Sequence, residues 1–243
     1  MLSSIKNELR KKIGLLSRSV LQQSRESQSR IINTLVLDSI EWKTSQTVGL
    51  FLPINGEPDI TPLIHAAMAQ GKRVLLPRVL GSKSNEMTML YLEEIEELDL
   101  FPSSKYGVKE PPLEVVSGIR KGLKRFAWDD IDVTNVTKKD LLVQPDYAQE
   151  RDRTFNIDLL VVPGVAFDTN CNRLGHGKGY YDSFIFRNKS LQQQLSKTER
   201  STFIVGVALI EQMIDNVPHD ERDMKLDAVI NPSGFIRCTS SSS

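Results

Sequence analysis

A near-continuous apolar run at residues 157–162, with the sequence IDLLVV, constrains the fold of this chain more than any other segment. A strand that alternates apolar and polar residues buries one face, whereas a continuous apolar strand is typical of a central position in a parallel sheet, buried on both faces. The run ends at Pro163-Gly164, and we expect a loop over 165–179 and a helix from Tyr180. The segment therefore predicts a parallel sheet with helices packed on its faces.

The N-terminal half predicts the same class of fold through a strand–helix–strand unit. Residues 47–52 indicate a buried strand, Thr61-Pro62 begins a helix that ends at Gly71, and residues 73–77 indicate the next strand. This order is that of a βαβ unit. Further strands are expected at 87–92, 203–209 and 226–230. We predict an α/β fold, a single three-layer domain with a mostly parallel sheet that is Rossmann-like in its layering.

Two helices are expected before the first strand. Apolar residues recur at helical spacing over residues 3–18, which predicts an amphipathic helix. The stripe consists of Ile5, Leu9, Ile13 and Leu16. Lys6 and Arg10 lie four residues apart on a neighbouring face of this helix. The second helix is expected over 24–41.

Composition limits the kinds of partner. The 243 residues allow one large domain or two small ones at ~150 residues per domain. Lys and Arg equal Asp and Glu at 31 each, so no overall field attracts nucleic acid or an anionic membrane. No apolar run approaches the ~18 residues that span a bilayer. We expect a monomer that acts on a small molecule, with one domain over 1–243, a surface insertion at 112–156 and a frayed tail at 239–243.

The cysteines and the N-terminus bear on the compartment. Cys171 and Cys238 belong to no zinc-type cluster, and so few cysteines favour a reducing, intracellular compartment. The first thirty residues lack the apolar stretch of a secretory signal. Because this segment is basic and rich in serine, it also fits a mitochondrial presequence. The cytoplasm is therefore expected, with the mitochondrion as the minor alternative.

The loop at residues 172–182, with the sequence NRLGHGKGYYD, favours a phosphate site. Glycines at the alternate positions 175, 177 and 179 allow the backbone to approach a ligand closely. Basic side chains lie between them, namely Arg173, His176 and Lys178. A helix that starts at Tyr180 would add its free N–H groups. The ordinary alternative is a flexible, solvated loop.

The familiar nucleotide-binding fingerprints do not fit this loop. Gly177-Lys178 is followed by glycine rather than by serine or threonine, so the loop is not a Walker A motif. Tyr180 stands where the dinucleotide fingerprint requires its third glycine. A phosphate site here must therefore be of another kind.

The loop and its surroundings resemble the signature of the 5-formyltetrahydrofolate cyclo-ligase family, also called methenyltetrahydrofolate synthetases. The resemblance rests on PGVAFD at 163–168 and on the loop at 172–182. Further segments also match the family, in the order in which they occur along the chain, at 6–10, 51–59, 106–111 and 220–227. It covers most of the chain except about 112–156.

The resemblance implies an enzyme that converts 5-formyltetrahydrofolate to 5,10-methenyltetrahydrofolate with hydrolysis of MgATP. ATP is the co-substrate and Mg²⁺ the cofactor. Transfer of the γ-phosphoryl group to the formyl oxygen makes that oxygen a leaving group, and N10 of the same folate closes the ring. Because both reacting groups belong to one molecule, positioning supplies much of the rate.

The resemblance also implies roles for individual residues. ATP contacts are implied for Lys6, Arg10, Arg173, Leu174, Gly175, His176, Gly177, Lys178, Gly179, Tyr180 and Tyr181. Lys178 and Arg173 are the implied catalytic residues, and Asp182 and Asp223 the implied magnesium ligands, with Asp168 and Asp220 as weaker candidates. The folate pocket is implied to use Leu52, Glu57, Tyr106, His176 and Tyr180. His176 departs from the arginine that some members carry at this position.

Two other functions remain open at this stage. A noncatalytic folate- or nucleotide-binding protein would keep the pocket and use the 112–156 insertion to contact a partner. A sugar-phosphate isomerase or an acyl transferase of related layering would share the phosphate loop without requiring ATP. Lys6 and Arg10, taken without the resemblance, would be ordinary solvated charges on a helix.

Overall fold

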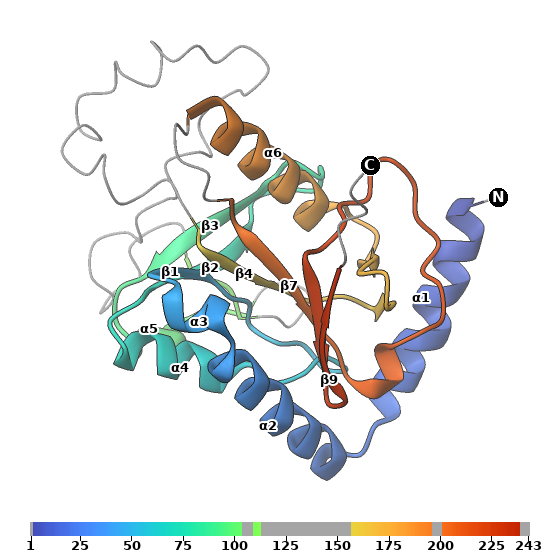
Figure 1. Cartoon of the computed structure of the whole chain (residues 1–243), viewed down its shortest axis with the longest axis horizontal. Helices are drawn as coiled ribbons and strands as arrows, with labels where there is room; N and C mark the ends of the chain where they lie inside the picture. Colours follow the sequence, from blue (N-terminus) through green and yellow to red (C-terminus); the bar gives the residue numbers. More distant parts are fainter. Residues whose placement is uncertain (1, 104–108, 113–156, 196–200, 239–243) are drawn as a thin grey trace.

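The computed structural model describes residues 2–103, 109–112, 157–195 and 201–238. Its centre is a seven-stranded sheet in the order β3-β2-β1-β4-β7-β8-β9 (Figure 1). The strands are β1 (Thr47–Gly49), β2 (Arg73–Val79), β3 (Met87–Leu92), β4 (Leu159–Val162), β7 (Phe203–Val207), β8 (Ala228–Asn231) and β9 (Gly234–Arg237). The five inner strands run parallel, and the edge strands β3 and β9 are antiparallel to their neighbours. The predicted mostly parallel sheet is confirmed.

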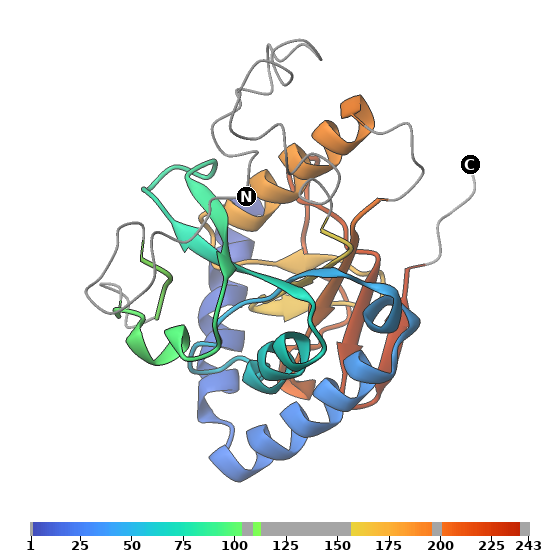
Figure 2. The same ribbon diagram turned by 90° about the vertical axis from the view of Figure 1, so that its left-hand side faces the viewer.

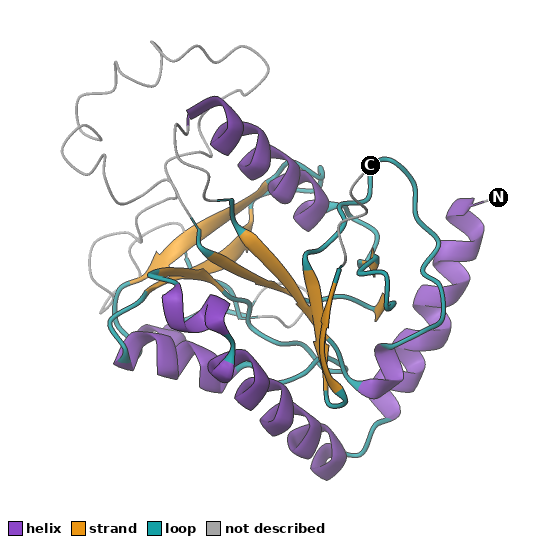
Figure 3. Cartoon of the chain, in the orientation of Figure 1, coloured by secondary structure: helices purple, strands orange, loops and turns teal. Residues whose placement is uncertain are grey.

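Helices cover both faces of this sheet, so the three predicted layers are also confirmed (Figure 3). On one face lie α2 (Gln22–Asp38), α3 (Ile40–Thr44) and α4 (Thr61–Ala69), whose apolar residues share one buried cluster with the sheet. On the other face α6 (Tyr180–Leu195) packs Phe184 and Ile185 into a second cluster. Helix α1 (Leu2–Ser19) lies at one side of the sheet (Figures 1 and 2).

Strand β4 shows why its apolar run is continuous. Leu159 and Val161 belong to the cluster beneath α2 and α4, whereas Leu160 and Val162 belong to the cluster beneath α6. Each of the four is at most 1% exposed. The strand therefore needs apolar side chains at every position, as the sequence predicts.

The βαβ unit is confirmed, with small differences at the ends of its elements. Strand β1 pairs in parallel with β2 from Thr47↔Arg73 to Gly49↔Leu75. Beyond Gly49 the chain makes one more bond to β2, from Leu50 N to the Leu75 carbonyl at 2.9 Å, and then leaves the sheet. The strand is thus shorter than the expected 47–52.

Two expectations about element boundaries are wrong. The second helix ends at Asp38, because Ser39 is extended and its hydroxyl accepts from Trp42 N to cap the separate helix α3. Strand β9 was not expected from the sequence. Gly234, at φ +145°, turns the chain back so that β9 pairs with β8.

Helix α1 forms over the expected residues but turns a different face inward. Its buried residues are Lys6, Ile13, Gly14 and Ser17. Ile5 and Leu16 are each 45% exposed, so the apolar stripe is only partly buried. Polar contacts of the helix with the glycine-rich loop and with residues 220–223 determine its rotation.

The acidic stretch after β3 is only partly a solvated face. It includes the short helix α5 (Glu97–Leu100), in which Glu97 is 5% exposed while Glu96 is exposed. The insertion beyond Pro112, Tyr106 and the tail at 239–243 lie outside the described residues. Within the described ranges, none of the helices combines the length and the apolar character needed to cross a membrane.

Candidate active site

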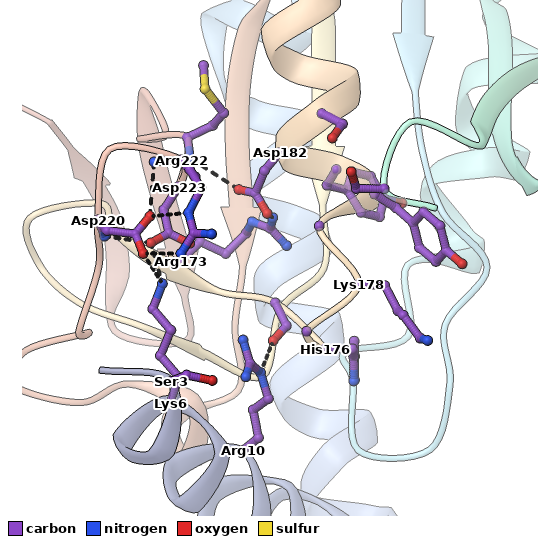
Figure 4. Close-up of a pocket in the computed structure, with 18 of the residues that line it drawn as sticks. Ser3, Lys6, Arg10, Arg173, His176, Lys178, Asp182, Asp220, Arg222 and Asp223 are labelled. Atoms are coloured by element: carbon purple, nitrogen blue, oxygen red, sulfur yellow. Dashed lines mark hydrogen bonds and ion pairs between the residues drawn. The ribbon is translucent and has the colours of Figure 1, made fainter. Parts of the chain in front are cut away.

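A cleft of about 860 Å³ lies beside the carboxyl end of β4, where Pro163 is part of its wall (Figure 4). Helix α1 forms one side, the glycine-rich loop and the first turns of α6 form another, and the segment 220–224 closes a third. The charged side chains that line it are Lys6, Arg10, Arg173, Lys178, Asp182, Asp220, Glu221, Arg222 and Asp223, together with His176. The structure thus brings together segments from both ends of the chain.

The glycine-rich loop contacts α1. Arg10 Nε donates to the Gly175 carbonyl at 2.8 Å. Gly177 has φ +98°, and a Cβ there would lie 3.2 to 3.4 Å from the Arg10 guanidinium. Gly179 is also left-handed, at φ +71°. The predicted positive-φ backbone is confirmed at two of the three glycines, and the close approach is to an arginine that itself faces the cleft.

Lys6 is a buried cation rather than a solvated surface charge. It is 8% exposed, and its Nζ lies 2.5 Å from Asp223 Oδ2 and 3.7 Å from Asp220 Oδ2. The Arg222 guanidinium and backbone N–H hold the pKa of Asp220 well below its usual range, so this carboxylate stays ionised. Lys6 therefore stands against two negative charges on the segment 220–223.

Arg10 completes the cationic face of α1. Burial lowers the pKa of its guanidinium, and the carboxylates of Asp223 and Asp182 oppose that shift. Because Lys6 and Arg10 are four residues apart on one helix, both reach the same cleft. An anion bound there would meet two positive charges.

Arg173 is held rigidly beneath the loop. It is 5% exposed, donates to the Pro163 carbonyl at 3.2 Å and pairs with Asp182 Oδ2 at 2.9 Å. Its guanidinium carbon lies 5.6 Å from the Tyr181 ring centre. Its Nε is buried and has no hydrogen-bond partner in the described residues. This leaves one donor of a fixed cation beside the cleft.

Lys178 and the two tyrosines of the loop differ in their surroundings. Lys178 is exposed and lies across the loop from Lys6 (Figure 4). The Tyr180 hydroxyl donates to the Gly81 carbonyl at 2.7 Å, which ties α6 to the turn between β2 and β3. Burial raises the pKa of the Tyr181 phenol. All three residues line the cleft.

The residues expected to form the folate pocket are only partly brought together. Glu57 is 6% exposed, and its Oε2 accepts from Ile54 N at 3.1 Å. Its Oε1 lies 3.1 Å from His176 Nε2, so it contacts the loop through that imidazole. Leu52 is half-buried against the sheet cluster. Neither Leu52 nor Glu57 lines the cleft itself, and Tyr106 lies outside the described residues.

Two carboxylates are available to a metal ion. Asp182 accepts from Met224 N at 3.1 Å through its second oxygen, while Asp223 Oδ2 holds Lys6 and the Asp220 N–H. Both carboxylates line the cleft, but no group of three or more potential ligands gathers within the described part of the chain. Mg²⁺ commonly takes one or two carboxylates and completes its shell with water and substrate phosphates. The donor set therefore fits Mg²⁺ that arrives with a phosphate ligand.

Asp168, the weaker candidate for a magnesium ligand, has a structural role in the fold. It is fully buried and accepts from the N–H groups of Asn170, Asn172 and Val217 and from the Asn172 side chain. These four bonds shape the turn that connects β5 (Ala166–Phe167) with β6 (Arg173–Leu174). No oxygen of Asp168 faces the cleft.

Several residues of the cleft were not anticipated, among them Arg222 and Phe186. Arg222 contacts Asp220, and its sequence position gave no sign of that pairing. Phe186 lines the cleft and is 59% exposed, which is unusual for a large apolar side chain on a helix. Its spacing of four residues from Asp182 places both on one face of α6, and this is the signal that could have indicated it.

The fold and the cleft define an α/β protein in which a glycine-rich loop borders a cleft lined by basic and acidic side chains. The family model described as the 5-formyltetrahydrofolate cyclo-ligase family matches residues 2–124 and 130–232. The chain therefore belongs to this family of ligases. Because the match continues through most of 112–156, the expectation that the resemblance stops there is wrong.

Individual relatives agree with this assignment. The chain is 33% identical over 235 residues to a probable 5-formyltetrahydrofolate cyclo-ligase of Schizosaccharomyces pombe, covering 96% of this chain and 97% of the relative. It is 28% identical to the 5-formyltetrahydrofolate cyclo-ligase of Mus musculus, covering 94% of each. The NMR structure of the 5,10-methenyltetrahydrofolate synthetase of Aquifex aeolicus superposes with a TM-score of 0.65 at 26% identity, covering 98% of this chain and 95% of that one.

Proposed function

We propose that this protein closes the ring of 5-formyltetrahydrofolate to give 5,10-methenyltetrahydrofolate, with MgATP hydrolysed to ADP and phosphate. The observation that carries the proposal is the convergence of cations from α1 and the loop on one cleft that also holds the carboxylates of Asp182 and Asp223. Lys6, Arg10 and Arg173 supply the cations. A polyphosphate with a bound Mg²⁺ matches both kinds of charge.

The need for phosphate transfer follows from the substrate. A formamide carbonyl is a weak electrophile and its oxygen leaves poorly, so the γ-phosphoryl group is passed to that oxygen. N10 then attacks the formyl carbon, the C–O bond breaks and inorganic phosphate departs. Such a reaction asks the protein chiefly to position the partners and to neutralise phosphoryl charge.

The side chains of the cleft have distinct parts in this proposal. Lys6 and Arg10 bind the phosphate chain, and the rigid Arg173 orients it from beneath the loop. Lys178, which is exposed and has no ion pair among the described residues, moves to the transferring phosphoryl group and stabilises its charge. Mg²⁺, held by Asp182 and Asp223, would screen the phosphate oxygens.

Glu57 is proposed as the folate acceptor. Its buried carboxylate is fixed through Ile54 N and stands beside His176 of the loop. A carboxylate so held suits the N–H donors of a reduced pterin ring. Because His176 contacts the same carboxylate, folate binding would have to displace or share that contact.

The direct test measures the near-ultraviolet absorbance of methenyltetrahydrofolate formed from 5-formyltetrahydrofolate. Product is expected with MgATP and not with ATP plus a chelator or without ATP. Binding of folate without turnover under all conditions would refute the cyclo-ligase proposal and favour the noncatalytic binder, which the contact between His176 and Glu57 makes a real alternative.

Two lysine variants, one in the cleft and one outside it, test the proposed catalytic role of Lys178. Lys178→Ala is expected to lower kcat by about 100- to 1000-fold, the usual loss when a donor to the transition state is removed. Lys12→Ala is the matched control, because Lys12 is also exposed but does not line the cleft. An unchanged kcat in Lys178→Ala would remove this lysine from the mechanism while leaving the reaction itself in place.

We also propose that the protein works in the cytoplasm as a monomer. Helix α1 carries Lys6 and Arg10 into the cleft, so removing it as a presequence would remove part of the site. Fractionation of cells and sedimentation of the purified protein test the two statements separately.

A further inference from the structure

The two cysteines of the chain lie side by side, although neither belongs to the cleft. Cys171 sits in the turn between β5 and β6, and Cys238 directly follows β9. The Cys171 thiol donates to the Ile236 carbonyl at 3.9 Å, and the Cys238 thiol donates to the Asn170 carbonyl at 3.7 Å. Each sulfur thus contacts the backbone next to the other cysteine, which brings the two thiols together.

The backbone holds both cysteines at this point. The Cys171 carbonyl accepts from Leu226 N at 3.1 Å, and Cys238 N donates to the Asp227 carbonyl at 2.9 Å. Cys171 and Cys238 are therefore anchored to consecutive residues of one segment. The proximity of the thiols follows from main-chain bonds rather than from the chance positions of side chains.

Cys171 also has an unusual backbone conformation. Its φ is +63°, and within the described ranges no other residue except glycine has a positive φ. An L-residue in this region costs about 1–2 kcal/mol relative to its ordinary conformations, so the surroundings impose it. The four bonds of Asp168 and the link to Leu226 are those surroundings.

We propose that Cys171 and Cys238 form a reversible intramolecular disulfide when the protein meets a low-molecular-weight disulfide oxidant. The Cys238 thiolate, which is the more exposed, attacks one sulfur of the oxidant and releases one small thiolate. Cys171 then loses its proton to solvent and attacks Cys238 Sγ, releasing the second thiolate. The two cysteines lose two electrons together, and the oxidant is reduced to two thiols. This proposal does not depend on the proposed function.

The order of the two steps follows from the environments. Burial raises the pKa of the Cys171 thiol to about 12, and the neighbouring Cys238 and Asp168 add to the shift while Lys225 opposes it. Since the thiolate is the attacking form, Cys171 is the slow, resolving partner. Closure of the disulfide is therefore expected to quicken by about tenfold per pH unit across the neutral and mildly alkaline range.

The bond would tie the end of β9 to the turn that leads into Arg173. A cross-link between positions so far apart in the sequence restricts the unfolded chain and raises stability. The oxidised protein is accordingly expected to melt at a higher temperature than the reduced protein. Reductant should return the melting temperature to its original value.

The test incubates the full chain with oxidised glutathione, removes the oxidant and counts thiols under denaturing conditions. The expected result is a fall from two titratable thiols to none in a monomer whose intact mass is lower by two hydrogens. Cys171→Ser is expected to stop at one bound glutathione on Cys238. Cys238→Ser is expected to react slowly or not at all, and it serves if Cys171→Ser fails to fold.

Three results would overturn the proposal. These are retention of both thiols at equilibrium, a wild-type protein that keeps bound glutathione, and oxidation that yields only dimers linked between chains. A melting temperature that does not respond to reductant would refute the claim that the bond fastens β9 to the turn. Each of these readouts is independent of turnover.

Discussion

At the scale of single residues, the site depends on a small number of close contacts between α1 and the loop. Gly177 is the clearest example, because its backbone is left-handed and its α-carbon faces the Arg10 guanidinium. Any side chain here would meet both a strained φ and an occupied space. The loop and the helix are thus mutually fitted, and the glycine is needed for two separate reasons.

Gly177→Ala tests this fit. The variant is expected to lose about 1 kcal/mol of stability from backbone strain and to lower kcat/KM by about 10- to 100-fold, since the loop and Arg10 must move apart. Thermal unfolding and steady-state kinetics measure the two effects.

Gly71→Ala is the matched control. Gly71 has φ +69°, but nothing lies within 4 Å of a Cβ built there, and it does not line the cleft. A similar loss of stability with unchanged kinetics is expected. If Gly177→Ala kept full activity, the contact between the loop and Arg10 would have no functional importance.

Individual residues also show how much of the candidate site could be predicted from the sequence. The loop motif was sufficient to predict that Arg173 and Lys178 lie together, because glycine spacing and charge are local properties of the sequence, whereas Lys6 and Arg10 were indicated only by the family resemblance. The pairing of Lys6 with Asp223 was beyond such reasoning, since it joins positions that only the fold brings together. The role of Asp168 could not be predicted for a different reason, which is local. A carboxylate beside a loop has the same sequence appearance whether it binds metal or backbone N–H groups.

At the scale of elements, α1 shows the limit of periodicity. Its apolar spacing predicted a helix correctly but does not give the rotation of that helix, because the buried side carries Lys6 and Ser17 beside Ile13. The hydrophobic pattern fixes a helix against a core only where burial dominates. Here ion pairs and the loop contact supply much of the docking.

Two alanine substitutions on α1 test which face of the helix is buried. Ile13→Ala is expected to destabilise the protein by about 2–4 kcal/mol, because Ile13 is 4% exposed and packs with Val165, Leu174 and Val217. Leu16→Ala should cost less than about 0.5 kcal/mol, since Leu16 is 45% exposed. Denaturant unfolding gives both values. Equal losses would mean that the apolar stripe is buried after all.

Edge strands were harder to predict from the sequence than the inner strands. The inner strands β1, β2, β4, β7 and β8 follow from apolar runs, which parallel pairing requires. Strand β9 has intermediate burial and no such run, so only its turn at Gly234 marks it. An edge strand that is partly solvated need not look apolar in the sequence.

At the scale of the whole molecule, the buried carboxyl group of Glu97 makes the stability of the fold depend on pH. Burial raises the pKa of Glu97; a backbone hydrogen bond at Glu93 opposes this shift, and the negative charges of Glu93 and Glu94 add to it. One oxygen of the Glu97 carboxylate is buried without a hydrogen-bond partner in the described residues. The folded state therefore binds this proton more tightly than the unfolded chain does.

The consequence for stability has a definite sign. The contribution of Glu97 is fully present below the pKa of the unfolded chain and is lost as the pH rises through the raised pKa of the folded state. Glu97→Gln is thus expected to stabilise the protein by ~1 kcal/mol at neutral pH, with the gain vanishing in mild acid. Melting temperatures across this range measure it. Glu96→Gln, at an exposed position of the same stretch, should have little effect at any pH.

The ion pair between Lys6 and Asp223 has a consequence for synthesis of the chain. The partners are separated by 217 positions, and a ribosome that adds ~5–20 residues per second needs roughly 10–40 s to make the second after the first. During that interval the nascent chain carries a basic helix whose acidic partners do not yet exist. Ligand binding that needs this ion pair must therefore wait until residues 220–223 have been translated.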